Sequence, residues 1–348
     1  MANGGLLYNA DMELIEKIIR ATERESTAAA EYYAACVVYL HTFLASRPRL
    51  SHADVRDRVE TLYRWFTEPP DAAGISDASH PEDLITDLLL FGMIGKALYF
   101  LSRQSSSQFL KEATRLFQSV EQMRSNIWLF HTAGQLAQAG FDIHFIPEAK
   151  GQPIKTPDYT ASRGDIRFHI EATTRSQAYT NIQDIDQLLW EILMGGDNGK
   201  ALKFTDPQFD PGVIAADLSQ CDLNANATGL SPRVKLQPNA FVVYPHPHSF
   251  VYDVTKDPTF FNQSNNTGNV VEYAIRYFQR LDKKKYFVRG LLIGTSMGLV
   301  VKGERVSSPK GAMMVLDHRY SSLAIPELAP AIYLVEAEPA DLGQLGDA

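Results

Sequence analysis

Cysteine is scarce in this sequence, which contains only Cys36 and Cys221 among 348 residues. Two cysteines exclude a disulfide framework and a cysteine-based zinc site, and they fit a reducing compartment. Long apolar runs are also missing, because no stretch reaches the roughly 18 residues that a membrane-crossing helix needs. The N-terminal MANGGLLYNADMELIEK lacks a basic region followed by an apolar core. We therefore expect a cytoplasmic protein without a membrane partner.

Common nucleotide-binding loops are absent as well. The chain has no Gly-x-x-x-x-Gly-Lys-Ser/Thr and no Gly-x-Gly-x-x-Gly after a predicted strand. A Gly-x-Ser-x-Gly pattern does occur in IGTSMG, with Ser296 as the candidate nucleophile of a serine hydrolase. A nucleophile elbow needs a helix after the serine, whereas GLVVKGERV is typical of a strand. We expect a glycine-rich hairpin turn at this point and keep the hydrolase as a minor alternative.

Charge is unevenly distributed along the chain. The formal net charge of −8 argues against a protein coated in basic surface. Residues 1–100 carry 15 acidic and 9 basic residues, whereas residues 275–319 carry 10 Lys or Arg and 3 acidic residues. Such a segment is typical of a solvated face, but it also predicts a surface that binds the phosphates of DNA or RNA. The candidate nucleic-acid-binding residues are Arg276, Arg280, Lys283, Lys284 and Lys285.

Hydrophobic periodicity divides the chain into two parts. From Asp11 to about Leu101 the apolar residues recur at helical spacing, which predicts a helical domain over residues 1–120. After Gly140, short β-like runs such as FDIHFIP and DIRFHIEATT alternate with the helical IDQLLWEILM. This predicts an α/β (α+β) domain over residues 121–335, with a mixed sheet flanked by helices. The acidic tail, residues 336–348, is rich in small residues, and we expect it to be disordered.

The pattern in the middle of the chain is specific enough to assign elements. Three consecutive strands of one sheet are predicted at Phe141–Pro147, Pro157–Ala161 and Asp165–Thr174. Helices are predicted near 124–139 and 183–194.

Two carboxylates lie at facing ends of this predicted hairpin. The Ser-Arg-Gly-Asp turn folds the chain back so that Asp158 approaches Glu171. Alternation places Arg167, His169, Glu171 and Thr173 on one polar face, so we expect Glu171 to project from the sheet and to contribute little packing. Neighbouring carboxylates repel unless a cation lies between them, and their hard oxygens suit Mg²⁺ or Mn²⁺. The pair therefore suggests metal-assisted hydrolysis of a phosphodiester.

The order of elements, together with AGQLAQAGFDIHFIPEAKGQPIKTPDYTA and RFHIEATT, resembles the PD-(D/E)XK nuclease superfamily. The likeness covers roughly Glu121 to Ser219. Pro157, Asp158 and Glu171 match the superfamily's motif positions. The resemblance implies a Mg²⁺-dependent (or Mn²⁺-dependent) nuclease in which both carboxylates ligate the metal, with a role in nucleic-acid processing or defence.

Two departures from the superfamily pattern bear on activity. Thr173 stands where the superfamily has the lysine that orients the attacking water, and the acidic residue often found on the preceding helix is absent near Leu129. Substitutes for the missing charge and the missing carboxylate occur elsewhere in the sequence, at Lys155, Lys200 and Lys203 and at Glu121 and Glu148.

Three alternatives remain open for these residues. The domain is an active nuclease, or it is an inactive domain that keeps the fold as a binding or assembly module. In the third alternative Asp158 caps a turn and Glu171 is a solvated strand residue. Metal affinity distinguishes the first two, because a binding module has no need to hold Mg²⁺.

Overall fold

The structure is a computed structural model of the whole chain. It describes residues 7, 10–20, 29–68, 81–104, 107–147, 155–174, 178–179, 183–196, 199–217, 222–223, 242–245, 277, 280–281, 283–301, 304–317 and 332–337. The chain divides into two compact units, one formed by Met1–Gln138 with Val301–Val306 and the other by Ala139–Val300 with Ser307–Ala348.

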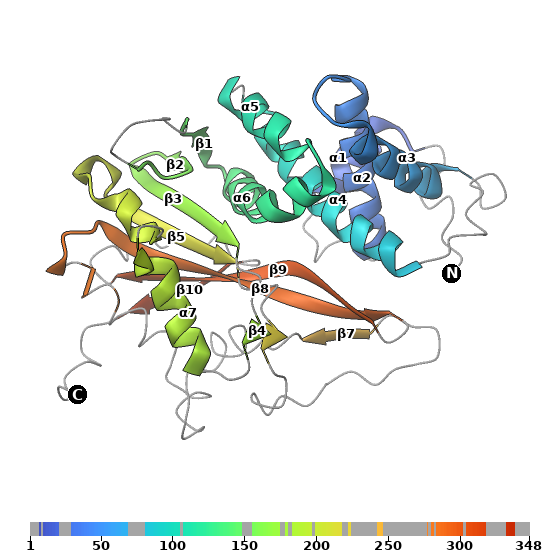
Figure 1. The fold of residues 1–348 in the computed structure, drawn as a ribbon. Coiled ribbons are helices and arrows are strands. Elements are labelled where there is room, and N and C mark those ends of the chain that lie inside the picture. Colours follow the sequence, from blue (N-terminus) through green and yellow to red (C-terminus); the bar gives the residue numbers. More distant parts are fainter. Residues whose placement is uncertain are drawn as a thin grey trace. The chain divides into compact units, whose positions relative to one another are not determined.

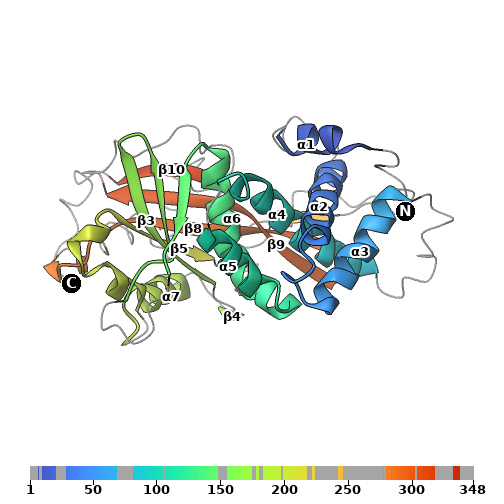
Figure 2. The ribbon, with the colours of Figure 1, turned by 90° about the horizontal axis from the view of Figure 1, so that it is seen from above.

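The first unit is helical, as its apolar periodicity predicts (Figures 1 and 2). Its helices are α1 (Met12–Arg20), α2 (Ala29–Ala45), α3 (Ala53–Thr67), α4 (Pro81–Leu101), α5 (Ser107–Leu116) and α6 (Val120–Gln138). The unit ends at Gln138, so that α6 belongs to it, whereas the sequence placed the boundary after residue 120. No helix in the described part of the chain combines the length and the apolar character that a bilayer crossing requires.

Glycine allows the helices of the first unit to pack backbone against backbone. A Cβ atom on Gly95 of α4 would collide with the backbone carbonyl of Cys36 in α2. A Cβ atom on Gly134 of α6 would lie 2.6 Å from the Cα atom of Ala97 in α4. Cys36 is buried, in keeping with a core position rather than a reactive one. The centre of this unit therefore has no room for larger side chains at these two glycines.

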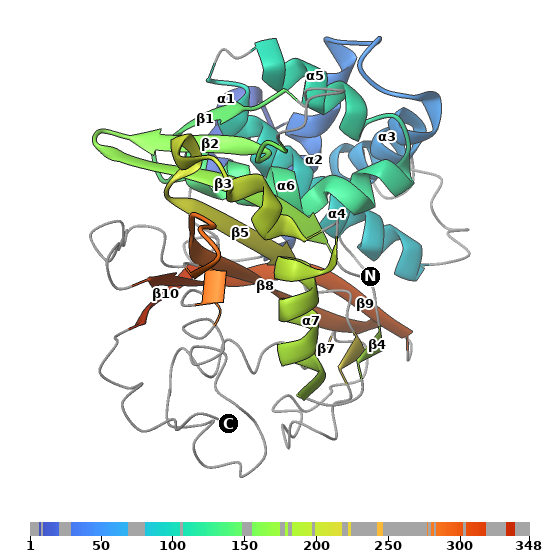
Figure 3. The same cartoon turned by 60° about the vertical axis from the view of Figure 1, so that its left-hand side comes forward.

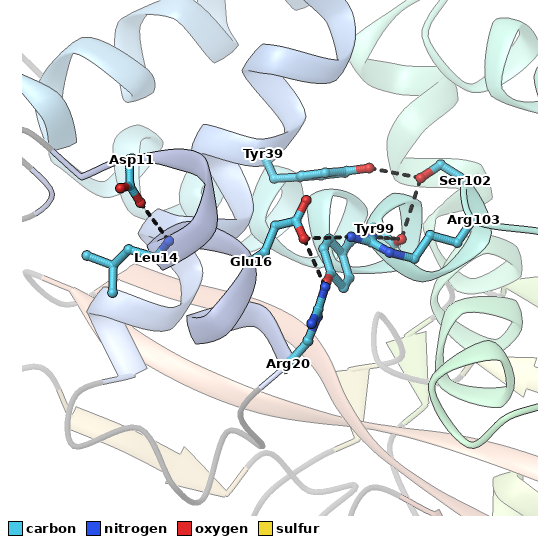
Figure 4. Close-up of polar contacts among 8 residues, drawn as sticks. All are labelled: Asp11, Leu14, Glu16, Arg20, Tyr39, Tyr99, Ser102 and Arg103. Atoms are coloured by element: carbon cyan, nitrogen blue, oxygen red, sulfur yellow. Dashed lines mark hydrogen bonds and ion pairs between the residues drawn. The ribbon is translucent and has the colours of Figure 1, made fainter.

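A polar cluster fastens α1 to α4 (Figure 4). The Glu16 carboxylate accepts a hydrogen bond from Nη2 of Arg20 at 3.0 Å and forms an ion pair with Nη2 of Arg103, also at 3.0 Å. Nε of Arg20 donates to the Tyr99 hydroxyl at 2.6 Å. The Arg103 guanidinium lies over the Tyr99 ring, 3.5 Å from its centroid. A buried tyrosine of α4 thus has its hydroxyl satisfied by an arginine of α1.

The second unit contains most of a mixed sheet. Its described elements are β1 (Asp142–Phe145), β2 (Tyr159–Arg163), β3 (Ile166–Thr174), β4 (Ala178–Tyr179), α7 (Gln183–Met194), the 3₁₀-helices η3 (Lys200–Phe204) and η4 (Pro207–Phe209), β5 (Gly212–Asp217), β6 (Asp222–Leu223), β7 (Val242–Pro245), β8 (Val288–Val301), β9 (Glu304–Asp317) and β10 (Ile332–Ala337). The main sheet has the order β1-β2-β3-β5-β8-β9-β10, with β7 paired to β8, and β4 pairs with β6 separately.

The strand directions follow from the connections (Figure 3). The pairs β1-β2 and β2-β3 are antiparallel, and a turn at Gly164 and Asp165 joins β2 to β3. The chain then crosses over through α7, η3 and η4 and returns as β5 parallel to β3, and β8 is parallel to β5. A crossover of this kind is how parallel strands are joined. The predicted mixed sheet, its three consecutive strands and the helix near 183–194 are confirmed, with ends shifted by up to two residues.

Two sequence-based expectations for the C-terminal part have different outcomes. The residues Ile293–Gly298 lie inside β8, so the expected glycine-rich turn is wrong. A backbone that continues as a strand past Ser296 also lacks the strand-to-helix turn of a nucleophile elbow. In the tail, Glu336 and Ala337 close β10, and residues 338–348 lie outside the described residues.

The close approach of α2 and α4 makes a prediction about stability. Gly95→Ala should lower the free energy of unfolding by roughly 1–3 kcal/mol, because an added methyl group in a packed core forces the backbone apart. Alanine ordinarily stabilises a helix interior relative to glycine by about 1 kcal/mol, so the sign of the effect is diagnostic. Denaturant unfolding measures it. Lys111→Ala, at an exposed position of α5, is the control and should change stability little. A stabilised Gly95→Ala variant would contradict the described packing.

Candidate functional site

The structure brings Asp158 and Glu171 together across the β2-β3 hairpin. Asp158 immediately precedes β2, and its backbone N–H donates to the Ile170 carbonyl at 2.9 Å. Its Oδ2 atom accepts from the Ala172 N–H at 2.8 Å. Asp158 therefore bonds to the residue before and to the residue after Glu171. The hairpin spacing alone predicts this proximity, and the hydrogen bonds fix it.

Glu171 is buried, and its expected position on an open polar face is wrong. Only 1% of its side chain is exposed, and the neighbouring His169 is also buried. The reason is that β3 is a central strand, paired with β2 on one edge and with β5 on the other, where Glu171 lies opposite Ile214. A central strand next to a crossover is covered on both faces. Removing Glu171 thus affects packing as well as charge.

Two lysines neutralise the buried carboxylate. Lys200 Nζ donates to Oε1 of Glu171 at 2.8 Å, and Lys203 Nζ forms an ion pair with Oε2, also at 2.8 Å. Lys203 Nζ also lies 3.8 Å from Oδ1 of Asp158. Residues three apart on a 3₁₀-helix share a face, so one turn of η3 aims both ammonium groups at the same carboxylate.

The anchoring of η3 explains why these lysines point inward. Ala201 and Phe204 are buried, and the Phe204 ring occupies the space that a side chain at Gly212 would need. The Phe204 carbonyl accepts from the Phe287 N–H at 2.8 Å, which ties η3 to the residue before β8. With Ala201 and Phe204 packed on the sheet, Lys200 and Lys203 face the carboxylates. Their side chains keep 25% and 21% exposure, so the cluster opens to solvent on this side.

The pKa of Asp158 is raised to about 7. Burial is the main cause, and the Glu171 carboxylate adds repulsion and a hydrogen bond that the neutral acid donates. Lys203 and the Ala172 N–H act in the opposite direction. Asp158 therefore changes charge near neutral pH.

The other predicted residues lie in several places. Thr173 is half-buried on β3, on the same face as Glu171, and Lys155 is exposed on the segment before β2. The lysines that contact Glu171 are Lys200 and Lys203 of η3, two of the three lysines that the sequence analysis named as substitutes. Glu121 is exposed at the start of α6 in the first unit. Glu148 lies outside the described residues.

Histidine 169 has a structural role. Its Nδ1 atom lies 2.9 Å from the Thr160 hydroxyl, and its ring packs edge-on against Phe209. Burial, with a smaller contribution from Arg167, lowers its pKa to about 4, so it is neutral in the folded protein. This is a buried, hydrogen-bonded histidine rather than a ligand that faces solvent.

The predicted basic cluster is exposed where it is described. Arg280, Lys283, Lys284 and Lys285 are exposed at the end of a helical segment before β8, and Arg276 lies outside the described residues. The Arg280 guanidinium lies 5.3 Å from the centroid of the Trp190 ring of α7. Arg289 differs from these residues because it is buried and pairs with Asp210.

The donor set can be compared with the needs of a divalent metal. Mg²⁺ is commonly bound by one or two carboxylates and completes its octahedron with water, so Asp158 and Glu171 fit it as protein ligands. The Lys203 ammonium, however, lies between their Oδ1 and Oε2 atoms. In the described residues there is no group of three or more His, Cys, Asp or Glu side chains arranged around a common point. A metal at this site must therefore displace Lys203.

Comparisons of the chain with family models, with curated proteins and with solved structures find no match.

The raised pKa of Asp158 predicts how stability depends on pH. Between the ordinary value of 3.8 and about 7, the folded protein holds a proton that the unfolded chain has lost. The free energy of unfolding contributed by this group is therefore greatest in acid and falls as the pH rises through about 7. His169, whose pKa is lowered, contributes in the opposite direction below its ordinary value of 6.5.

Asp158→Asn isolates the contribution of this carboxyl group. In metal-free buffer, the free energy of unfolding of the wild type should fall relative to that of the variant between about pH 5 and about pH 8. Denaturant titration at several pH values measures this difference. The His169 contribution is common to both proteins and cancels. An unchanged difference across this range would mean that Asp158 has an ordinary pKa in the folded state.

Proposed function

We propose that the second unit is a PD-(D/E)XK-like, metal-dependent phosphodiesterase that acts on nucleic acid as an endonuclease. The observation that carries this proposal is the cluster in which Asp158 and a buried Glu171 meet two lysines at a partly exposed position. The order of the β1-β2-β3 meander, the α7 crossover and the parallel β5 supports it, because the superfamily resemblance implies the same order.

Each residue of the cluster has a role in this proposal. Asp158 and Glu171 hold Mg²⁺ or Mn²⁺, which when bound polarises the phosphoryl oxygen and lowers the pKa of a water molecule. Lys200 remains on Oε1 of Glu171 and orients the attacking water, the role that Thr173 cannot perform because it carries no charge. Lys203 leaves the carboxylates and its ammonium neutralises a phosphate oxygen of the substrate. The exposed cations Arg280 and Lys283–Lys285 bind the nucleic-acid backbone.

A second candidate function is supported by the charge balance of the same cluster. Two carboxylates and two ammonium groups already balance one another, so the folded unit needs no metal to relieve their repulsion. This favours an inactive nuclease-like module that binds nucleic acid or assembles with a partner. The two candidates differ in whether Lys203 gives way to a metal.

Cleavage assays test the enzymatic proposal. With Mg²⁺ or Mn²⁺, wild-type protein should cleave DNA or RNA, and Glu171→Gln and Lys200→Met should each reduce the rate by at least about 100-fold, because each removes a preorganised charge at the reacting phosphate. Thr173→Lys should give no gain, since Lys200 already supplies that charge. Lys111→Gln, on an exposed helix of the first unit, is the control. Because Glu171 is buried, thermal unfolding must show that every variant is folded at the assay temperature.

The opposite pattern in these assays would favour the inactive module. In that case wild type cleaves nothing. Cleavage gained by Thr173→Lys would identify a site that binds metal but lacks its lysine, and Lys200 would then lose its proposed role.

Calorimetry with Mn²⁺ tests whether Lys203 occupies the metal position. At a pH above the pKa of Asp158, which loss of Lys203 raises further, Lys203→Met should bind Mn²⁺ about tenfold or more tightly than wild type, because no ion pair has to be broken first. Lys200→Met should not show this gain, since Lys200 lies on the other oxygen of Glu171. Absence of Mn²⁺ binding in Lys203→Met would remove the metal from the proposed function.

A further inference from the structure

Three consecutive lysines form an exposed turn in the second unit. Lys283, Lys284 and Lys285, called here the basic turn, follow a helical segment whose Tyr277 and Leu281 are buried. The Leu281 carbonyl accepts from the Lys284 N–H at 3.1 Å and from the Tyr286 N–H at 3.0 Å. These bonds close the helical segment at its C-terminal end and leave the three ammonium groups in solvent.

The backbone at Lys285 favours glycine over lysine. Its φ angle is 60°, which makes it the one non-glycine residue with positive φ in the described part of the chain. Helices commonly end in this left-handed conformation, and glycine is the usual residue there because a Cβ atom is disfavoured. A positive charge near a helix C-terminus interacts well with the helix dipole, which accounts for Lys283 and Lys284. The helix dipole does not account for a lysine rather than a glycine at position 285, where φ is positive.

Backbone hydrogen bonds fix the basic turn to the candidate site. Two residues after Lys285, the Phe287 N–H donates to the Phe204 carbonyl at 2.8 Å, and the Phe287 carbonyl accepts from the Gly212 N–H at 2.8 Å. Phe204 directly follows Lys203. With 3.8 Å between successive Cα atoms and about 5 Å across a backbone pair, the Cα atoms of Lys203 and Lys285 lie within roughly 16 Å of each other.

We propose that the basic turn binds a phosphate of the nucleic-acid strand a few nucleotides away from the phosphate at Lys200 and Lys203. A strand rises about 3.4 Å per nucleotide, so a Cα separation of roughly 16 Å corresponds to about five nucleotides before the reach of the two lysine side chains is added. The lysine at the left-handed position supplies part of this charge at a cost in stability. The inference takes nucleic acid as the ligand from the proposed function. It adds the position along the strand at which the basic turn makes its contact.

Three variants separate charge from backbone strain. Lys285→Gln removes the charge and keeps the strain, Lys285→Gly removes both, and Lys111→Gln removes an equivalent exposed charge from the first unit. Binding of fluorescent oligonucleotides of decreasing length is measured by anisotropy at several salt concentrations, with Ca²⁺ in place of Mg²⁺ so that the carboxylates hold a cation and Lys203 is released while cleavage is suppressed. Thermal unfolding of the same proteins is recorded, and anionic phospholipid vesicles serve as a second polyanion.

The expected result has three parts. Both Lys285 variants bind a long oligonucleotide several-fold more weakly than Lys111→Gln, and their salt dependence is flatter by about one unit of slope. The difference from wild type shrinks as the oligonucleotide becomes too short to span both positions. Lys285→Gly unfolds at a higher temperature than wild type, whereas Lys285→Gln does not.

Other results overturn the inference. Lys285→Gln and Lys111→Gln with equal affinity and equal salt slope would show that the turn makes no specific phosphate contact. Wild-type protein that binds vesicles but no oligonucleotide would assign the turn to a membrane surface. The enzymatic proposal fails separately, through absence of hydrolysis of bis(p-nitrophenyl) phosphate and of nucleic acid, and binding that depends on Lys285 would still uphold the turn as a phosphate site.

Discussion

The buried carboxylate of Glu171 constrains the rest of the second unit. An ionised carboxylate is stable inside a protein only when opposite charges and hydrogen bonds replace its water. Here the replacement comes from Lys200 and Lys203 on η3. The placement of η3 in turn needs the Phe204 ring to pack at Gly212, where a Cβ atom would collide with it. The crossover between β3 and β5 therefore does more than connect two parallel strands, because it carries the charges that allow Glu171 to be buried.

The same ion pairs decide between catalysis and binding. An active metal site requires Asp158 and Glu171 to share a cation, and the structure has an ammonium group in that position. Lys203 keeps 21% exposure and has a long, flexible side chain, so it can turn toward solvent without disturbing the Ala201 and Phe204 anchors. Lys200 is not in this position, since it contacts the other oxygen of Glu171. Two lysines that look equivalent in sequence thus have different relations to the carboxylate pair.

Local patterns in the sequence were sufficient for the meander and for the approach of Asp158 to Glu171, because strand alternation and a turn signal act over a few residues. They were insufficient for the burial of Glu171. Alternation shows which residues share a face, but whether a face is covered depends on a segment 29 residues further along the chain. The spacing of Lys200 and Lys203 in GKALKF is the signal that was available. It becomes informative only if the segment is known to be a 3₁₀-helix that packs on the sheet. The turn expected at Ser296 failed for a related reason, since β8 runs through its glycines with β5 and β7 as partners.

The arrangement of charge also bears on how a polyanion would approach. With a net charge of −8, the protein as a whole repels nucleic acid at long range, and screening confines that repulsion to about 8–10 Å at physiological salt. Attraction must therefore come from local cations. Glu171 is buried, Asp158 keeps 28% exposure and is half neutralised near pH 7, and the partly exposed groups nearest to both are ammonium groups. A phosphate that enters this cluster meets the ammonium groups of Lys200 and Lys203 beside one partly exposed carboxyl group, that of Asp158. The Phe204–Phe287 hydrogen bond links the segment that follows the basic turn to the same 3₁₀-helix.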